Sequence, residues 1–391
     1  MKRKLIHFPF LALFLISGIV RGQNIFLKGK YVEIGVHPAG SFGSSTAAPT
    51  GYHGNAAGGL LGFICDVNKD GWNTGTPNLM GDYFVPGSPE EGWGIEWSNS
   101  RSGTSKSDFF NFGLMGEQEV SMISHQKVKT TGREQSQWIG SASNSGRSAL
   151  IYQTVSLDSL AQYFTINVLI KNTGTDTLFN VGYFRNVDPD NEQRLNGNYI
   201  THNYIQHQPG WWGNVDKAAV VAYGNQYKSP CILGAIDSRA HVSIGGFSVR
   251  DINDVFDFTD STLVKSNPNY RDEAISIAFD LQHIAPGKCV TLAYYYALQN
   301  INPEDIAFPV SMQFDISDDG FTTSQSFVGG NLCVRDTILD FAVKTNGMGA
   351  SFIDKVLWDA DMDGIYELQG DTVEIAFKGW KKHKFSQRIV F

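Results

Sequence analysis

The sequence predicts an all-β fold, a large antiparallel β-sandwich of two sheets with long loops along its edges. Apolar and polar residues alternate in several short runs, as they do in a half-buried strand, and residues 163–171 show this pattern most clearly. The composition agrees, because 41 glycines, 13% aromatic residues and only 18% charged residues are typical of loop-rich β proteins. Apolar periodicity indicates no amphipathic helix longer than about three turns.

Further candidate strands are separated by segments rich in glycine, serine and asparagine. Residues 37–59 form the longest of these segments, and we expect a loop there. Residues 275–281 and 290–298 flank the turn sequence Ala-Pro-Gly-Lys, a pattern that predicts a β-hairpin. The remaining predicted strands are residues 23–36, 60–65, 117–123, 148–157, 181–184, 218–223, 232–236 and 331–344.

Residues 1–22 have the pattern of a secretory signal peptide. Three basic residues precede an apolar run, and small residues precede a cleavage site before Gln23. A membrane anchor is the alternative interpretation, but the apolar run is short for a spanning helix. No later stretch is apolar for long enough to cross a bilayer, so we expect a secreted or cell-surface protein with no transmembrane segment in the mature chain.

A domain boundary near residue 345 and a β-hairpin appended to the main sandwich are the two open interpretations of the C-terminal part of the chain. Residues 23–344 are predicted to form the main β-sandwich domain. Residues 345–391 carry an acidic loop between strand-like flanks, and we expect a C-terminal β extension there.

The mature chain is acidic. Removing the leader takes away four basic residues and no acidic one, so 27 Lys and Arg remain against 39 Asp and Glu, a net charge of −12. This excess argues against nucleic acid and anionic membrane surfaces as partners. It also leaves carboxylates available for cations.

The chain has four cysteines, and their spacing is too wide for a zinc site. In an oxidising compartment an even number predicts one or two disulfides, with the pairing left open. The alternative is that some are free, buried thiols. The four are Cys65, Cys231, Cys289 and Cys333.

The strongest local motif is the acidic loop at residues 359–367. Carboxylates alternate along it and a glycine follows the third, which is how a tight turn supplies the hard oxygen ligands of calcium. An EF-hand has a glutamate at the twelfth position, and that residue here is Gly370, so the loop resembles calcium loops between β-strands. The alternative is an acidic turn that binds nothing. The predicted calcium ligands are Asp359, Asp361, Asp363, the carbonyl of Ile365 and Glu367.

A second, less complete motif begins at Asp66. Asp66, Asn68 and Asp70 alternate before Gly71, as in the first half of a calcium loop, but the second half is missing. The two open interpretations are a calcium site completed by a distant carboxylate and a satisfied hydrophilic turn.

Residues 171–213 gather charge, imidazole and indole more densely than any other stretch. Three interpretations of this stretch stay open. The first is a cation or sugar site, whose candidate ligand-binding residues are Arg185, Asn191, Trp211 and Trp212. The second is a carboxylate pair for glycoside hydrolysis. The third is a turn held by Arg185. The candidate catalytic residues are Asp188, Asp190, Glu192, His202 and His207.

Two spacings within this stretch carry geometric predictions. His202 and His207 are five residues apart, which places them on opposite faces of a strand and disfavours a shared metal. Trp211 and Trp212 are adjacent and cannot both face inward on a regular strand, so we expect at least one exposed indole.

Several segments together resemble a known group of proteins. The segments are residues 66–93, which begin DVNKDGW, residues 184–193, FRNVDPDNEQ, and residues 356–367, VLWDADMDGIYE. They resemble β-rich ectodomains of secreted or surface proteins of Bacteroidetes, of the type exported by the type IX secretion system, among adhesin-like and gliding-associated proteins. The resemblance implies an exported β-sandwich and supplies no catalytic residues. No C-terminal sorting domain is recognisable after Glu367.

The function expected first is a secreted or cell-surface binding or adhesion protein, stabilised by calcium, with an extracellular glycan as one candidate ligand. The alternatives are an extracellular polysaccharide hydrolase or lyase that uses the loop of Asp188, Asp190 and Glu192, and a purely structural surface module. An enzyme requires facing carboxylates with at least one desolvated, whereas a binding module requires a shallow groove with an exposed indole.

Overall fold

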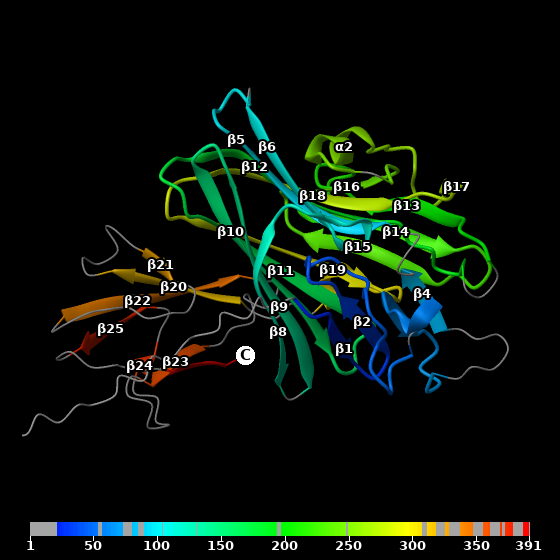
Figure 1. The fold of residues 1–391 in the computed structure, drawn as a ribbon, viewed down its shortest axis with the longest axis horizontal. Coiled ribbons are helices and arrows are strands. Elements are labelled where there is room, and N and C mark those ends of the chain that lie inside the picture. The colour runs from blue at the N-terminus through cyan, green and yellow to red at the C-terminus, as the bar shows by residue number, and fades with distance from the viewer. Residues whose placement is uncertain are drawn as a thin grey trace, which may run out of the picture.

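The structure, a computed structural model, describes residues 22–53, 57–72, 80–84, 90–103, 105–130, 132–193, 197–247 and 249–306, and seven separate strands between residues 311 and 390. Antiparallel sheets stacked in layers make up the part of the chain before residue 307 (Figure 1). The predicted all-β fold, a large antiparallel β-sandwich with long loops, is confirmed.

The larger of the two main sheets has nine strands. Its central meander forms because long runs of alternating residues, β9 to β11 among them, pair in sequence order. In spatial order the strands are β17 (Asn269–Arg271), β13 (Thr201–His207), β14 (Lys217–Gly224), β15 (Pro230–Ile236), β19 (Cys289–Ala297), β11 (Tyr163–Asn172), β10 (Arg147–Asp158), β9 (Arg133–Asn144) and β8 (Ser121–Thr130).

The second main sheet has six strands and faces the first. Its central strand β12 is buried along most of its length, because the nine-stranded sheet covers one face and a short helix covers part of the other. The strands in spatial order are β16 (Ala240–Ile244), β18 (Ile275–Ile284), β12 (Leu178–Val187), β5 (Glu91–Ser98), β6 (Lys106–Phe112) and β7 (Glu117–Gln118).

Side chains from both main sheets meet in one large aromatic core. The ring of Trp93 lies 5.4 Å from that of Trp138 and 5.9 Å from that of Tyr183, between ring centroids. Tyr183 in turn lies 6.0 Å from Tyr294 across the sandwich. All four are buried. Fully burying one large apolar side chain contributes about 1.5–3 kcal/mol, so each of these aromatic residues adds to the stability of the sandwich.

Helix α2 (Ile252–Asp257) covers the outer face of the six-stranded sheet (Figure 1). Its N-cap is Asp251, whose side chain accepts the backbone N–H of Asn253. Ile252 and Val255 pack against Phe184 of β12. The three short 3-10 turns are η1 (Ala57–Gly59), η2 (Gly113–Met115) and η3 (Pro303–Asp305). Of the helices in the described ranges, none is long and apolar enough to cross a bilayer.

Three smaller sheets complete the described chain. One contains β1 (Ile25–Lys28), β2 (Val32–Val36), β3 (Phe63–Asp66) and β4 (Met80–Phe84). The other two contain β21 (Gln325–Phe327), β20 (Ser311–Ser317), β22 (Thr337–Asn346) and β25 (Thr372–Phe377), and β24 (Leu368–Gln369), β23 (Lys355–Asp359) and β26 (Ser386–Val390). The predicted boundary at residue 345 falls inside β22, which pairs with β20 before it and β25 after it.

The predicted hairpin at residues 275–298 is wrong. Strand β18 pairs with β12 and β16 in the six-stranded sheet, whereas β19 pairs with β11 and β15 in the nine-stranded sheet. The turn between them crosses from one sheet to the other. Backbone bonds to Asn172 hold it there, since Gly287 donates to the Asn172 carbonyl at 3.0 Å and Asn172 donates to the Lys288 carbonyl at 2.9 Å.

Cys65 and Cys231 are free, buried thiols, and burial raises the pKa of each. For these two residues the structure therefore has the alternative of free, buried thiols and not a disulfide, and they behave as small core side chains. Cys333 lies outside the described residues, so the prediction is not tested there.

Candidate functional site

Strand β12 carries Arg185 into the space between the two main sheets. Its Nε donates to Oε1 of Glu91 at 2.5 Å, and its Nη1 donates to the Gly40 carbonyl at 3.2 Å. The guanidinium lies 4.3 Å from the ring centroid of Phe42. Both charged side chains are fully buried. Arg185, expected to bind a ligand, is a core residue that no solute reaches.

Tyrosines surround this buried ion pair. The hydroxyls of Tyr183 and Tyr294 lie 2.8 Å apart, and Tyr296 donates to Oε1 of Glu91 at 3.4 Å. Burial raises the pKa of Glu91, and Arg185 opposes part of that rise. Burial acts to lower the pKa of Arg185, but the carboxylate of Glu91 holds it well above its ordinary value. The arrangement is a polar layer inside the core rather than a reaction centre.

Beyond β12, three carboxylates come together at the end of the sandwich. Oxygens of Asp188, Asp190 and Asp272 all lie within 4.8 Å of one another. Asp190 is buried, Asp188 is half-buried and Asp272 is exposed. Burial raises the pKa of Asp188 to about 7, and the charges of Asp272 and Glu90 add to the rise. Asp188 therefore holds a proton up to neutral pH, which relieves the repulsion within the cluster.

The next two residues, Asn191 and Glu192, tie this segment to the β14–β15 turn. The Asn191 amide donates to the carbonyls of Ala222 and Ser229 at 2.9 and 2.6 Å. The Glu192 carboxylate accepts the backbone N–H groups of Gln226 and Tyr227, each at 2.7 Å. Asn191 and Glu192 are buried. Both therefore serve the fold and are not accessible as ligand-binding or catalytic groups.

Glycine is required where Glu192 approaches β14. A Cβ atom on Gly224 would lie 1.9 Å from Oε1 of Glu192, far inside van der Waals contact. The sequence therefore pairs a small residue with the buried carboxylate that closes the turn.

The two histidines lie at opposite ends of β13 and on one face of it. His202 is opposite Tyr223, whereas a register shift after Ile205 puts His207 opposite Ala219. Tyr223 and Ala219 both belong to the apolar cluster on the outer face of the nine-stranded sheet. The prediction of opposite faces is wrong, because the shift adds one residue to β13. Five strand residues still separate the imidazoles by about 16 Å, so they do not share a metal.

His202 has ordinary local partners, and His207 lies near charged side chains. His202 stacks on Tyr223, with centroids 4.8 Å apart, and its Nε2 lies 3.2 Å from Oδ1 of Asn225. Burial lowers the pKa of His207, and the charge of Lys217 lowers it further.

The tryptophan pair follows β13 in a tight loop. Trp211 is half-buried and packs against the main core, whereas 65% of Trp212 is exposed, which confirms the prediction of one exposed indole. The two rings meet edge to face at 5.3 Å. Trp212 has φ of +50°, between Gly210 and Gly213, which also have positive φ. This conformation is uncommon for a bulky residue, so the loop holds the indole outward at a cost in backbone strain.

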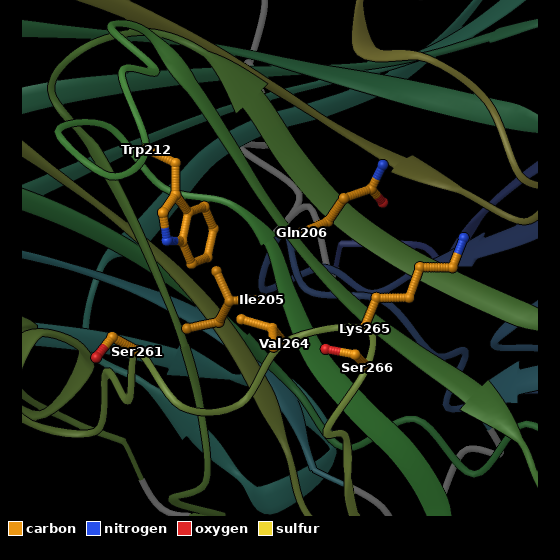
Figure 2. A pocket seen from close by; sticks show the side chains of 7 residues that line it. All are labelled: Ile205, Gln206, Trp212, Ser261, Val264, Lys265 and Ser266. Carbon is orange, nitrogen blue, oxygen red and sulfur yellow. The ribbon is translucent and has the colours of Figure 1, made fainter.

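Trp212 forms one wall of an open groove of about 730 Å³ (Figure 2). The indole lies beside Ile205 and Val264, and the side chains of Gln206 and Lys265 extend across the other side. The loop at residues 261–266 forms another side of the groove, and its Leu263 carbonyl accepts the N–H of Ile205 at 2.8 Å. The lining is completed by Ser261 and Ser266.

A second hollow of about 350 Å³ adjoins the first, since Gln206 and Lys265 line both. It lies over the outer face of the nine-stranded sheet and is richer in amides and carboxylate. Its other lining residues are Tyr204, Ile232, Asn300, Ile301, Asn302 and Asp305. Together the two hollows, which we call the β13 groove, present an exposed aromatic ring, two adjoining polar rims and one lysine.

The Asp66 motif has the geometry of a satisfied turn. Oδ1 of Asp66 accepts the N–H of Asp70 at 3.1 Å, and Oδ2 accepts those of Gly71 and Trp72 at 3.0 and 3.1 Å. Asp66 is buried, whereas Asn68 and Asp70 are exposed. Both carboxylate oxygens thus hold the backbone of the turn, as the hydrophilic-turn alternative requires, and calcium binding at this motif stays a prediction.

The other predicted calcium loop lies largely outside the described residues. Strand β23 ends at Asp359, and β24 begins at Leu368. Asp361, Asp363, Ile365 and Glu367 are not among the residues that the structure describes, so calcium binding there stays a prediction.

Comparison with known proteins gives distant likenesses only. Neither a protein-family model nor a curated protein matches the sequence. Similar solved structures include a human-microbiome protein provisionally described as a kojibiose phosphorylase (8% identity, TM-score 0.33, covering 70% of this chain and 29% of that one). Another is a TPR-domain containing protein from Parabacteroides distasonis (10% identity, TM-score 0.38, covering 73% of this chain and 49% of that one). A third is a galactose mutarotase-like protein from Clostridium acetobutylicum (9% identity, TM-score 0.34, covering 71% of this chain and 95% of that one).

The chain thus spans less than half the length of the first two of these proteins. At these TM-scores the likenesses carry no argument about the site, which stands on its own geometry.

Several residues of the β13 groove carry no sequence signal of their own. Lys265 and Ser266 come from a loop far along the chain from Trp212, and Asn300 and Asn302 follow β19. None belongs to a motif. In the sequence, Gln206 is distinguished only by its position between the two histidines of β13.

Proposed function

We propose that the protein is an extracellular glycan-binding protein and that the β13 groove is its binding site. The observation that carries the proposal is the exposed indole of Trp212, held over an open groove by a strained loop. An indole offers a flat apolar surface for the C–H face of a sugar ring. Without a ligand, exposure of that surface to water is unfavourable. A binding site of this kind needs a rigid aromatic residue with few convergent polar groups.

The polar rim supplies the groups that a sugar requires. Gln206, Asn300 and Asn302 each offer a donor and an acceptor, as hydroxyl groups demand. Lys265 lines both hollows and adds an ammonium donor to them. The groove is open along its length, which fits a chain-like ligand better than a small enclosed one.

Export and calcium complete the proposal. The leader at residues 1–22 supports a secreted or cell-surface location, where adhesion to a glycan is a plausible role. The proposal places calcium in the loop at residues 359–367, as a stabiliser rather than a ligand of the sugar, because that loop has the more complete set of ligands.

The experiment is affinity electrophoresis of the mature protein through gels that contain laminarin, xylan, dextran, mannan or chondroitin sulfate. We expect at least one polysaccharide to retard the wild type, and Trp212→Ala to remove the retardation. Phe247→Ala is the matched control, because Phe247 is an exposed aromatic residue outside the groove. Equal retardation of wild type and Trp212→Ala would overturn the proposal.

A hydrolase remains the second candidate, and one observation favours it. Asp188, whose pKa burial raises to about 7, lies beside the exposed Asp272, so a carboxyl that holds a proton and a solvent-exposed carboxyl in a different environment are close neighbours. Such a pair is what acid and base roles in glycoside cleavage require. Release of reducing ends from the five polysaccharides by wild type, and not by Asp188→Asn, would support it. No release would exclude these substrates.

A further inference from the structure

The β13 groove does not end at Tyr204. His202 and Tyr204 occupy alternate positions on the outer face of β13, and Gln206, which lies at the register shift, lines the groove together with Tyr204. The ring of Tyr204 meets that of Tyr223 edge to face at 6.0 Å. These residues therefore lead from the groove to the free end of the nine-stranded sheet.

Three aromatic rings lie across this end of the sheet. His202 stands opposite Tyr223 on β14 and opposite Tyr270 on β17 in the strand register. Its ring stacks on Tyr223 at 4.8 Å with 10° between planes, and lies 4.5 Å from the ring of Tyr270. We call Tyr270, His202 and Tyr223 the aromatic ladder. Cross-strand pairs of this kind hold their rings at fixed positions.

The ladder is partly open to solvent. Tyr270 is 47% exposed, and His202 and Tyr223 are half-buried. Lys228 places its ammonium group 5.3 Å from the centre of the Tyr223 ring. Tyr270 is exposed on a short edge strand, where packing does not require an aromatic ring. A surface that stacks on a ligand does require one.

The β13 groove and the aromatic ladder lie along the same strand, and the ring of Tyr204, of which only 5% is exposed, lines the groove and contacts Tyr223 of the ladder. We refer to the groove and the ladder together as the extended surface from Trp212 to Tyr270. From Gln206 to His202 the strand alone covers about 13 Å, and Trp212 lies beyond that end. Stacked rings sit about 4.5–7 Å apart, so the surface offers room for several sugar rings and is too long for one. The mature chain is also acidic, which disfavours a nucleic acid chain, the other polymer that stacks on aromatic residues.

We propose that this surface binds an internal stretch of a linear polysaccharide, several sugars long, with one end on Trp212 and the other on the aromatic ladder. This inference rests on the proposed function and adds the ligand's length and direction to it. Affinity should then grow with chain length until both ends of the surface are filled, because each added ring contact contributes separately.

The test uses oligosaccharides of one to eight sugars, prepared by partial acid hydrolysis of whichever of the five polysaccharides retards the wild type most. Titration calorimetry measures Kd for wild type, Trp212→Ala, Tyr270→Ala, His202→Ala/Tyr270→Ala and Phe247→Ala. We expect wild-type Kd to fall at least about tenfold between two and six sugars, the equivalent of one good ring contact. Both ladder variants should match wild type on two sugars and lose most of that gain on six.

Each outcome separates the two proposals. If Kd levels off at one or two sugars and the ladder variants equal wild type on six, the extended surface is refuted, while loss of binding in Trp212→Ala keeps the groove. If Trp212→Ala binds all lengths as wild type does, the groove itself is refuted and the extended surface with it. Tyr270→Ala alone guards against misfolding of the double variant, since its ring is largely exposed, and thermal melting verifies both.

Discussion

The guanidinium of Arg185 and the carboxylate of Glu91 form an ion pair, Nε to Oε1 at 2.5 Å, with both side chains fully buried between the two main sheets. Replacing Arg185 by Met would leave the Glu91 charge unpaired in the core. We expect a loss of about 3–5 kcal/mol in the free energy of unfolding, measured by urea denaturation. Arg271→Met, at an exposed position, should change it by less than about 0.5 kcal/mol.

The partner substitution makes this prediction sharper. Glu91→Gln combined with Arg185→Met removes both charges, so the double variant should be more stable than Arg185→Met alone. A double variant as unstable as the single one would show that the pair is not the source of the loss.

Glu192 and Gly224 should be coupled energetically. Glu192→Ala leaves two backbone N–H groups without their acceptor and should cost about 1–3 kcal/mol. Gly224→Ala should cost a similar amount because its Cβ displaces the carboxylate. In the Glu192→Ala background the same glycine substitution should cost little. Thermal unfolding of the four proteins completes the double-mutant cycle, and additive losses would contradict the contact.

Asp188 should make the fold less stable as pH rises. Its folded-state pKa of about 7 lies above the ordinary value of 3.8, so the folded protein binds the proton more tightly than the unfolded chain. The contribution is favourable at low pH, falls between about pH 4 and pH 7, and is lost above that range. Glu96 adds to this trend, since burial raises its pKa to about 7 as well.

The difference between wild type and Asp188→Asn isolates Asp188. We expect the variant to gain stability relative to wild type as pH rises from 4 to 8, in urea unfolding at four pH values. Asp257→Asn, at an exposed position of α2, is the control. A difference that stays constant with pH would contradict the raised pKa.

Calcium should stabilise the mature protein through residues 359–367. A ligand that binds only the folded state at 100 times its Kd contributes about 2.7 kcal/mol, so Tm should be higher in calcium than in EDTA. Asp361→Asn/Asp363→Asn should abolish the shift. Asp66→Asn should lower Tm equally with and without calcium, because Asp66 holds backbone amides. A shift that survives the first variant and disappears in the second would reverse this assignment.

The class of fold follows from local patterns, and its topology does not. The alternation at residues 163–171 is visible in the sequence, and strand β11 occupies that position. The turn before Cys289 has the sequence pattern of a hairpin, yet the strands on its two sides join different sheets. Each of these strands pairs with the strands beside which its side chains are buried, and local sequence does not identify those partners. Likewise the spacing of His202 and His207 misleads, since one added residue in β13 changes the face.

The site was predictable only in part, for the same reason. One exposed indole in the pair Trp211–Trp212 follows from adjacency on the chain. Burial of Arg185 does not, because its partner Glu91 lies on another strand and neither belongs to a motif. The groove joins Trp212 to Lys265 through a loop contact to β13, and such a juxtaposition has no counterpart in local sequence.

The central claim is that the indole of Trp212 stacks on sugar rings in the β13 groove. The most direct measurement is calorimetric titration of wild type, Trp212→Phe and Trp212→Ala with the polysaccharide that retards the wild type most. The account predicts that Trp212→Ala binds at least about tenfold more weakly than wild type and that Trp212→Phe, which keeps an aromatic face, lies between them. Equal affinity for all three proteins, with unchanged Tm, would contradict it.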